Sequence, residues 1–137
     1  MKPVLVDTNV LIDIFTDDPV WYTWSRDQLT LLRQSARLVI NPIIYSEISI
    51  GYTRIETLEA VLKQLPLTYE EIPKAALFLA GKAFVRYRRS GGVKSAPLPD
   101  FFIGAHAAVR NLRLITRNPA RIAAHFPTVE LITPSST

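Results

Sequence analysis

Short apolar runs alternate with longer segments of helical periodicity along the whole chain. The short runs are rich in β-branched residues and too brief for helices, so buried strands are predicted over residues 2–6, 37–40, 112–116 and 129–132, with a weaker strand over 67–72. Helices are predicted over residues 9–15, 19–36, 42–50, 54–64, 73–89 and 101–109, and a further short helix is expected to open at Asn118 and Pro119.

The alternation of strands and helices is typical of a parallel sheet that helices cover on both faces. We therefore expect an α/β fold, a three-layer α/β/α sandwich with a central, mostly parallel sheet of four to five strands. The chain has 137 residues, of which 48% are hydrophobic, and this is the size of one common domain. A single domain is expected over residues 1–133, followed by a C-terminal tail at 134–137.

Three acidic residues interrupt the apolar pattern. Asp7 ends the first predicted strand, Glu47 lies within an apolar helix, and Asp100 directly precedes another apolar helix. No lysine or arginine lies within three residues of Glu47 or Asp100. Because an ionised carboxylate removed from water costs several kcal/mol unless it is paired, a bound cation is the first candidate partner.

The predicted fold brings these acidic residues together. Ligands of parallel α/β sheets bind beyond the carboxyl ends of the strands. Asp7 and Asn118 each follow a strand, and Glu47 and Asp100 are expected near helix starts that face the same edge. Taken singly, Asp7, Asp100 and Asn118 have an ordinary reading as helix N-caps, and Glu47 as a side chain that reaches solvent. The convergence of all four favours one cation site.

The composition restricts the kind of cation. The chain has no cysteine, so thiolate metal sites, disulfides and thiol nucleophiles are excluded. Carboxylate and amide oxygens suit Mg²⁺ or Mn²⁺, which lower the pKa of a bound water and assist hydrolysis of phosphate esters. Metal-assisted hydrolysis is therefore the expected chemistry.

Four segments strongly resemble the motifs of a PIN domain, with the nearest likeness to VapC-type toxin ribonucleases of bacterial toxin–antitoxin pairs. These segments are Val6–Leu11, Ser46–Ile48, Pro99–Ala107 and Leu114–Asn118, and their order and spacing are specific as a set. The resemblance covers the whole chain. It implies a Mg²⁺- or Mn²⁺-dependent endoribonuclease whose partners are RNA, a cognate antitoxin that lies across the active-site groove, and a second copy of the chain in a homodimer.

The resemblance also implies roles for individual residues. Asp7, Glu47 and Asp100 would be the catalytic metal ligands. Thr8 and Asn9 would orient Asp7 and the bound waters, and Thr116 would support the site through its hydroxyl group. The fourth acidic position of the family falls at Asn118. Because an amide offers an oxygen but no charge, Asn118 is a candidate fourth ligand that would hold a second metal only weakly.

Basic residues suggest where RNA binds. The net charge is +4, and eleven of the 16 basic residues are arginines, which match phosphate geometry. The candidate RNA contacts are Arg86, Arg88, Arg89 and Lys94, close before Asp100, and Arg117 beside Asn118. A solvated helix end that complements the helix dipole is the alternative reading of the first group.

The remaining motifs leave alternatives open. His106 and His125 are expected to be structural rather than catalytic bases. The cluster Trp21-Tyr22-Thr23-Trp24 fits either the core or an interface. A catalytically weak PIN scaffold that binds RNA or protein is the alternative function. A phosphotransferase with Asp7 as the nucleophile is less favoured, because Asn9 stands where such chemistry usually has a second aspartate.

The sequence has no recognisable signal peptide and no run of about 18 apolar residues that would span a membrane. We expect a cytoplasmic protein without a membrane partner.

Overall fold

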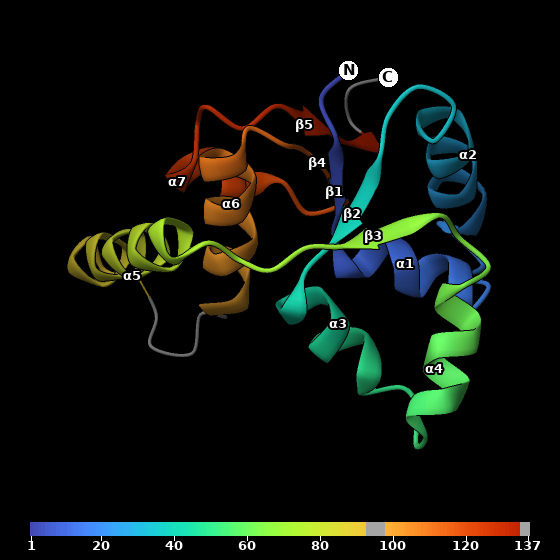
Figure 1. Ribbon diagram of the computed structural model, residues 1–137. Coiled ribbons are helices and arrows are strands. Elements are labelled where there is room, and N and C mark those ends of the chain that lie inside the picture. Colours follow the sequence, from blue (N-terminus) through green and yellow to red (C-terminus); the bar gives the residue numbers. More distant parts are fainter. Residues whose placement is uncertain (93–97, 135–137) are drawn as a thin grey trace.

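In the computed structural model, which describes residues 1–92 and 98–134, five strands form one parallel sheet between layers of helices (Figure 1). The strands are β1 (Val4–Val6), β2 (Leu38–Ile40), β3 (Leu67–Tyr69), β4 (Arg113–Ile115) and β5 (Leu131–Ile132), in the spatial order β3-β2-β1-β4-β5. Each neighbouring pair is parallel. The predicted three-layer α/β/α sandwich is confirmed.

The helices occupy the connections between these strands. They are α1 (Thr8–Phe15), α2 (Tyr22–Leu32), α3 (Pro42–Ser49), α4 (Ile55–Leu62), α5 (Lys74–Arg89), α6 (Leu98–Arg110) and α7 (Ala120–His125). The predicted helix over 19–36 begins only at Tyr22, because the Asp18 carboxylate accepts hydrogen bonds from the Val20 and Trp21 N–H groups and closes a turn there. The helix predicted from 101 begins earlier, at Leu98, because Pro99 is tolerated in a first helical turn.

The strand order creates a crevice between β1 and β4. The chain passes outward from β1 through β2 to β3, and then returns to the other side of β1 as β4 and β5. In parallel sheets such a reversal opens a crevice at the carboxyl ends of the two central strands. Asp7 and Thr116 directly follow β1 and β4, so both stand at this point.

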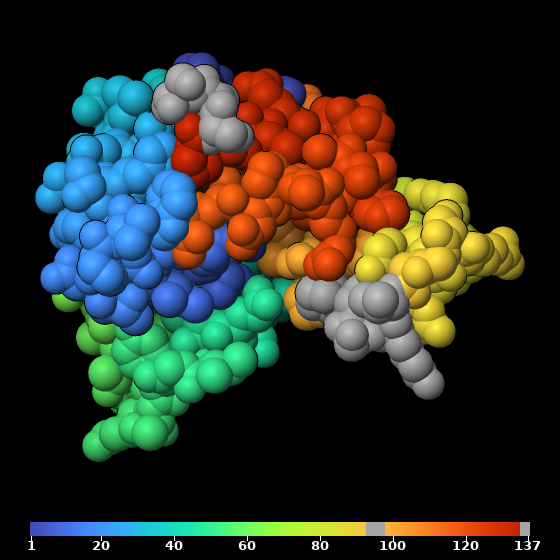
Figure 2. All heavy atoms as spheres, turned by 180° about the vertical axis from the view of Figure 1, so that it is seen from behind, coloured from blue at the N-terminus to red at the C-terminus, as the bar shows by residue number. Residues whose placement is uncertain are grey.

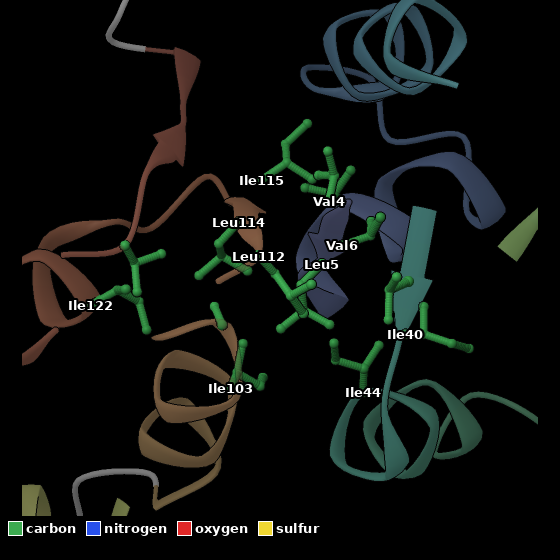
Figure 3. Packing of buried hydrophobic residues seen from close by; sticks show 14 of the residues in the cluster. Val4, Leu5, Val6, Ile40, Ile44, Ile103, Leu112, Leu114, Ile115 and Ile122 are labelled. Atoms are coloured by element: carbon green, nitrogen blue, oxygen red, sulfur yellow. The ribbon is translucent and has the colours of Figure 1, made fainter. Parts of the chain in front are cut away.

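The core lies on both faces of the central strands. All residues of β1, β2 and β4 are buried, whereas the edge strands β3 and β5 are only partly buried. Ile44 of α3 and Ile103 of α6 point from their helices toward β1 (Figure 3). These two residues stand one helical turn from Glu47 and Asp100, on the same helix faces. The core contacts therefore fix both acidic side chains at the sheet edge.

Close packing also positions α7 against α6. Gly104 of α6 lies so near the Phe126 ring and the Ile122 side chain that a β-carbon at this position would overlap the ring. Residues 120–125 are thereby held beside the first turns of α6. Among the helices described, none is both long and apolar enough to cross a membrane.

Candidate metal centre

The structure brings the four predicted polar residues to one cavity. This cavity has a volume of about 240 Å³ and lies at the carboxyl edge of β1 and β4. Its lining consists of Asp7, Thr8, Asn9, Ile12, Glu47, Asp100, Ile103, Asn118 and Ile122. Residues from α1, α3, α6 and the loop before α7 thus meet in a single space.

Asp7 is both a helix cap and part of this cavity. One carboxylate oxygen accepts a hydrogen bond from the Thr8 N–H at 2.8 Å, and the other accepts from the Thr116 hydroxyl at 2.6 Å. Burial above all, together with the charges of Asp100 and Glu47, raises the pKa of Asp7 from 3.8 to about 6, against the lowering effect of the two hydrogen bonds. Asp7 is therefore costly to ionise without a cation.

Glu47 is held by α1. The Thr8 hydroxyl donates a hydrogen bond to a Glu47 carboxylate oxygen at 2.6 Å. The expectation that Glu47 lies near a helix start is wrong, because α3 begins at Pro42 with Asn41 as its N-cap, and Glu47 is the sixth of its eight residues. The carboxylate reaches the cavity because the short helix α3 packs against α1.

Asp100 stands inside the first turn of α6 rather than at its N-cap. Its carboxylate is not without a basic partner: the Arg121 guanidinium of α7 donates to it at 2.7 Å. Asn118 is not a cap either, since Pro119 occupies that place before α7. Of the three residues read as possible caps, Asp7 alone has that role among the residues described.

The predicted supporting residues link β4 to β1. The Asn9 amide donates to Asp7 at 3.3 Å, and its carbonyl oxygen accepts from the Arg117 N–H at 3.3 Å. The Thr116 hydroxyl, besides donating to Asp7, accepts from the Asn118 N–H at 3.1 Å. The loop after β4 is thus tied to the first turn of α1.

The donor set suits a hard divalent cation, although the site is not preassembled. In the described part of the chain, no group of three or more His, Cys, Asp or Glu side chains is placed closely enough to hold a metal as it stands. Arg121 donates a hydrogen bond to Asp100, and Thr8 donates one to Glu47. The buried Asp7 is repelled by the charges of Asp100 and Glu47. Oxygen ligands that repel one another and line one cavity fit Mg²⁺ or Mn²⁺.

The raised pKa of Asp7 leads to a pH-dependent prediction. We expect the affinity for Mn²⁺ to fall about tenfold between pH 7 and pH 5, because only the ionised carboxylate binds metal and Asp7 takes up a proton near pH 6. Isothermal titration calorimetry at pH 7, 6 and 5 measures this change. Equal affinities at pH 7 and pH 5 would show that Asp7 is not a ligand.

The predicted RNA-binding residues fall into two groups. Arg86, Arg88 and Arg89 are exposed at the end of α5, which contacts the start of α6 through Tyr87 and Phe101, whose ring centroids are 5.5 Å apart. This brings the basic helix end close to Asp100. Lys94 lies outside the described residues, so its predicted role remains a prediction.

Arg117 has a structural partner that the sequence did not indicate. Its guanidinium donates to both carboxylate oxygens of Asp13, at 2.7 and 3.0 Å, and stacks on the Trp21 ring. Asp13 is 2% exposed and also accepts from the Ser25 hydroxyl at 2.8 Å. RNA contact by Arg117 stays a prediction, and it would compete with this ion pair. An acidic residue between two isoleucines was the available signal for Asp13; Glu47 was identified by a similar signal, an acidic residue within an apolar helix.

Both histidines have structural surroundings. The buried His106 bonds to the Asn41 amide and to Glu70, each at 3.1 Å, and burial lowers its pKa. His125 packs against Tyr87 and Phe101. Neither residue lines the carboxylate cavity. Trp21 and Trp24 are both half-buried and meet edge to face. Trp24 packs against the core, whereas the choice between core and interface stays open for Trp21.

Comparison with known protein families identifies the family of the chain. The chain matches the PIN domain family over residues 4–124, and it belongs to that family. The predicted resemblance to PIN domains is thereby confirmed. No curated protein matches the chain in a sequence comparison.

Several solved structures share the fold. A chain of VapBC2 from Rickettsia felis, bound to a promoter DNA fragment, has 20% identity and a TM-score of 0.73 over 95% of this chain and 97% of its own. A chain of DNA-bound VapBC from Salmonella typhimurium has 21% identity and a TM-score of 0.69, over 97% of this chain and 98% of its own. A chain of a toxin–antitoxin complex from Klebsiella pneumoniae has 24% identity and a TM-score of 0.66, over 96% of this chain and 97% of its own. At these identities the likeness is one of fold.

Proposed function

We propose that the protein is a Mg²⁺- or Mn²⁺-dependent endoribonuclease that acts as the toxin of a toxin–antitoxin pair. The observation that carries this proposal is the meeting of Asp7, Glu47, Asp100 and Asn118 in one cavity at the crevice between β1 and β4. Membership of the PIN domain family and the fold shared with VapBC chains support it.

In this proposal the side chains of the protein bind the cation and hold one another in the orientation that binding requires. Asp7, Glu47 and Asp100 would hold the cation, and Asn118 would add a neutral oxygen. When bound, the cation supplies Lewis acidity and lowers the pKa of a coordinated water. Thr8 and Thr116 fix the orientation of the carboxylates through their hydroxyl groups. His106 is not available as a base, because both of its ring nitrogens are already hydrogen-bonded.

RNA is the proposed substrate because of the charge near the cavity. Arg86, Arg88 and Arg89 form an exposed basic end on α5, where guanidinium groups can bind phosphates. Arg88 also lies over the Phe84 ring, 5.9 Å from its centroid, which limits its freedom. We propose that this helix end binds the RNA backbone next to the cleaved bond.

A cognate antitoxin is the proposed protein partner. An apolar cavity of about 530 Å³ adjoins the carboxylate cavity and shares Thr8, Ile12 and Glu47 with it. Its other lining residues include Phe15, Ile48 and Tyr52. A peptide that filled this cavity would lie directly beside the carboxylates, which fits inhibition by an antitoxin segment.

A homodimer in the cytoplasm completes the proposal. Helix α5 projects from the body of the molecule (Figure 2). It buries Ala76, Ala80 and Ala83, while Leu77, Phe78 and Val85 remain exposed, with Phe78 at 68%. An exposed apolar stripe on a projecting helix is suited to pairing with a second copy.

The function is tested by cleavage of structured RNA with Glu47→Gln. We expect cleavage in Mg²⁺ or Mn²⁺ to fall at least about 100-fold, because a ligand charge is lost at the centre that supplies most of the catalysis. Glu56→Gln is the matched control, since Glu56 is exposed on α4 and, among the residues described, its ion-pair partner is the exposed Arg54. A Glu47→Gln protein with wild-type activity would rule out Glu47 as a ligand.

A catalytically weak PIN scaffold is the second candidate function. It is favoured by the amide at Asn118 and by the Arg121 partner of Asp100, since both reduce the negative charge available to a metal. RNA binding without any metal-dependent cleavage by the wild-type protein would support the scaffold. Metal-dependent cleavage that is absent in Asp100→Asn would exclude it.

A further inference from the structure

Two arginines at this edge of the sheet pair with aspartates in very different ways. Arg117 makes two hydrogen bonds to Asp13, and the side chains are 21% and 2% exposed. Arg121 makes one hydrogen bond to Asp100, at 2.7 Å, and these side chains are 31% and 38% exposed. The first pair is desolvated and bidentate, whereas the second has one hydrogen bond and is about one-third exposed. A solvent-accessible pair of this kind is worth about 1 kcal/mol, so Arg121 can exchange its partner at little cost.

The position of Arg121 does not depend on Asp100. Helix α7 is held against α6 by the close packing of Gly104 with Ile122 and Phe126. The Arg121 guanidinium also lies over the Tyr87 ring, 5.9 Å from its centroid. Of its five N–H donors, one is used by Asp100 and no further hydrogen bond forms within the described residues. If Asp100 turned to another partner, the guanidinium would stay beside the cavity with free donors.

The charges of the cavity determine what such an exchange would do. Asp100 can be neutralised by a guanidinium or by a divalent cation, and the two compete for the same carboxylate. Asn118 adds no charge that would hold a second cation. We propose that Arg121 holds Asp100 in the metal-free protein, releases it when a divalent cation binds, and then binds a phosphate oxygen of the RNA. This inference rests on the proposed function and assigns a phosphate-binding residue to the same site.

The exchange is tested by two binding measurements on Arg121→Met. Calorimetric titration with Mn²⁺ alone is expected to give up to about fivefold tighter binding than wild type, because the pair with Asp100 no longer has to be broken. Binding of a fluorescent single-stranded oligoribonucleotide in Ca²⁺, with the RNA checked for intactness, is expected to be about tenfold weaker. The slope of log affinity against log salt should fall by about 0.7, the value for one lost phosphate contact on a single strand.

Two further variants make the result specific. Arg121→Lys keeps the charge, so its Mn²⁺ affinity is expected within about threefold of wild type. Arg26→Gln removes a positive charge from an exposed arginine that pairs with Asp27 and does not line the cavity, and it is expected to change neither measurement. Circular dichroism confirms that each variant is folded.

The possible results separate the inference from the proposed function. Tighter Mn²⁺ binding together with weaker RNA binding supports the exchange, since a merely structural arginine would weaken both or change neither. Unchanged Mn²⁺ affinity in Arg121→Met overturns the competition for Asp100. Unchanged RNA affinity and salt slope overturn the phosphate contact. A wild-type protein that binds neither Mn²⁺ nor RNA would overturn the proposed function and this inference with it.

Discussion

Replacing Asp7 with asparagine is expected to lower metal-dependent RNA cleavage at least about 100-fold and yet to make the protein more stable at neutral pH. The activity falls because a metal ligand loses its charge. The stability rises because burial and two neighbouring carboxylates make the ionised Asp7 unfavourable in the folded chain. An activity loss with a stability gain would distinguish a functional residue from a structural one.

The sign of the stability effect follows from the pKa of Asp7. The folded protein has the higher pKa, about 6 against 3.8, so it binds more protons than the unfolded chain between these values. The contribution of Asp7 to stability is therefore fully present below pH 3.8 and is lost as the pH rises through 6. A difference of this size corresponds to at most about 3 kcal/mol.

The expected gain for Asp7→Asn at pH 7 is smaller, about 1 kcal/mol, because the amide nitrogen cannot accept the hydrogen bond that Thr116 now donates. Urea unfolding at pH 7 and at pH 4 measures it, and the gain should vanish at pH 4. Asp27→Asn is the control, since Asp27 is exposed on α2 and lies outside the cavity. A destabilised Asp7→Asn protein at pH 7 would contradict the prediction.

Replacing Asp13 with asparagine should cost about 3 kcal/mol or more of unfolding free energy, the usual loss when one partner of a buried ion pair is removed. Asp13 is 2% exposed and accepts hydrogen bonds from Arg117 and Ser25. The variant would leave the guanidinium of Arg117 half-buried without its charged hydrogen-bond partner. Urea unfolding at pH 7 gives the value.

A double-mutant cycle tests whether the loss at Asp13 comes from the pair. Arg117→Met in the Asp13→Asn background should recover part of the lost stability, because it removes the unpaired charge. Glu130→Gln is the comparison, since it breaks an exposed pair with Lys2 and should cost less than about 1 kcal/mol. A loss at Asp13 no larger than that at Glu130 would show that the pair contributes little.

Much of the fold could be predicted from local patterns. Strands buried on both faces are apolar at nearly every position, which is why β1, β2 and β4 were recognisable from a few residues; Arg113 at the start of β4 is the exception. The ends of the elements were less predictable. The strand expected over 67–72 ends at Tyr69, because the ladder stops where Glu70 N–H meets the Ile40 carbonyl.

The candidate site could be predicted as a set of residues but not as a set of contacts. Asp7, Glu47 and Asp100 stood out because each interrupts an apolar run. The partners of acidic residues gave no such signal: Arg117 meets Asp13 across 104 positions of sequence, and Arg121 meets Asp100 across 21. Such pairings depend on how β4 and α7 are placed against α1 and α6, which periodicity does not encode.

The sequence by itself determined the alternation of strands and helices, the oxygen-only donor set and the positions of three costly carboxylates, because these depend on residue type and local spacing. The tertiary structure decided that the carboxylates share one cavity between β1 and β4, that burial makes Asp7 hard to ionise, and that one arginine forms a buried bidentate pair while another forms a partly exposed one. Burial and charge pairing follow from strand order and helix packing, which are properties of the whole chain.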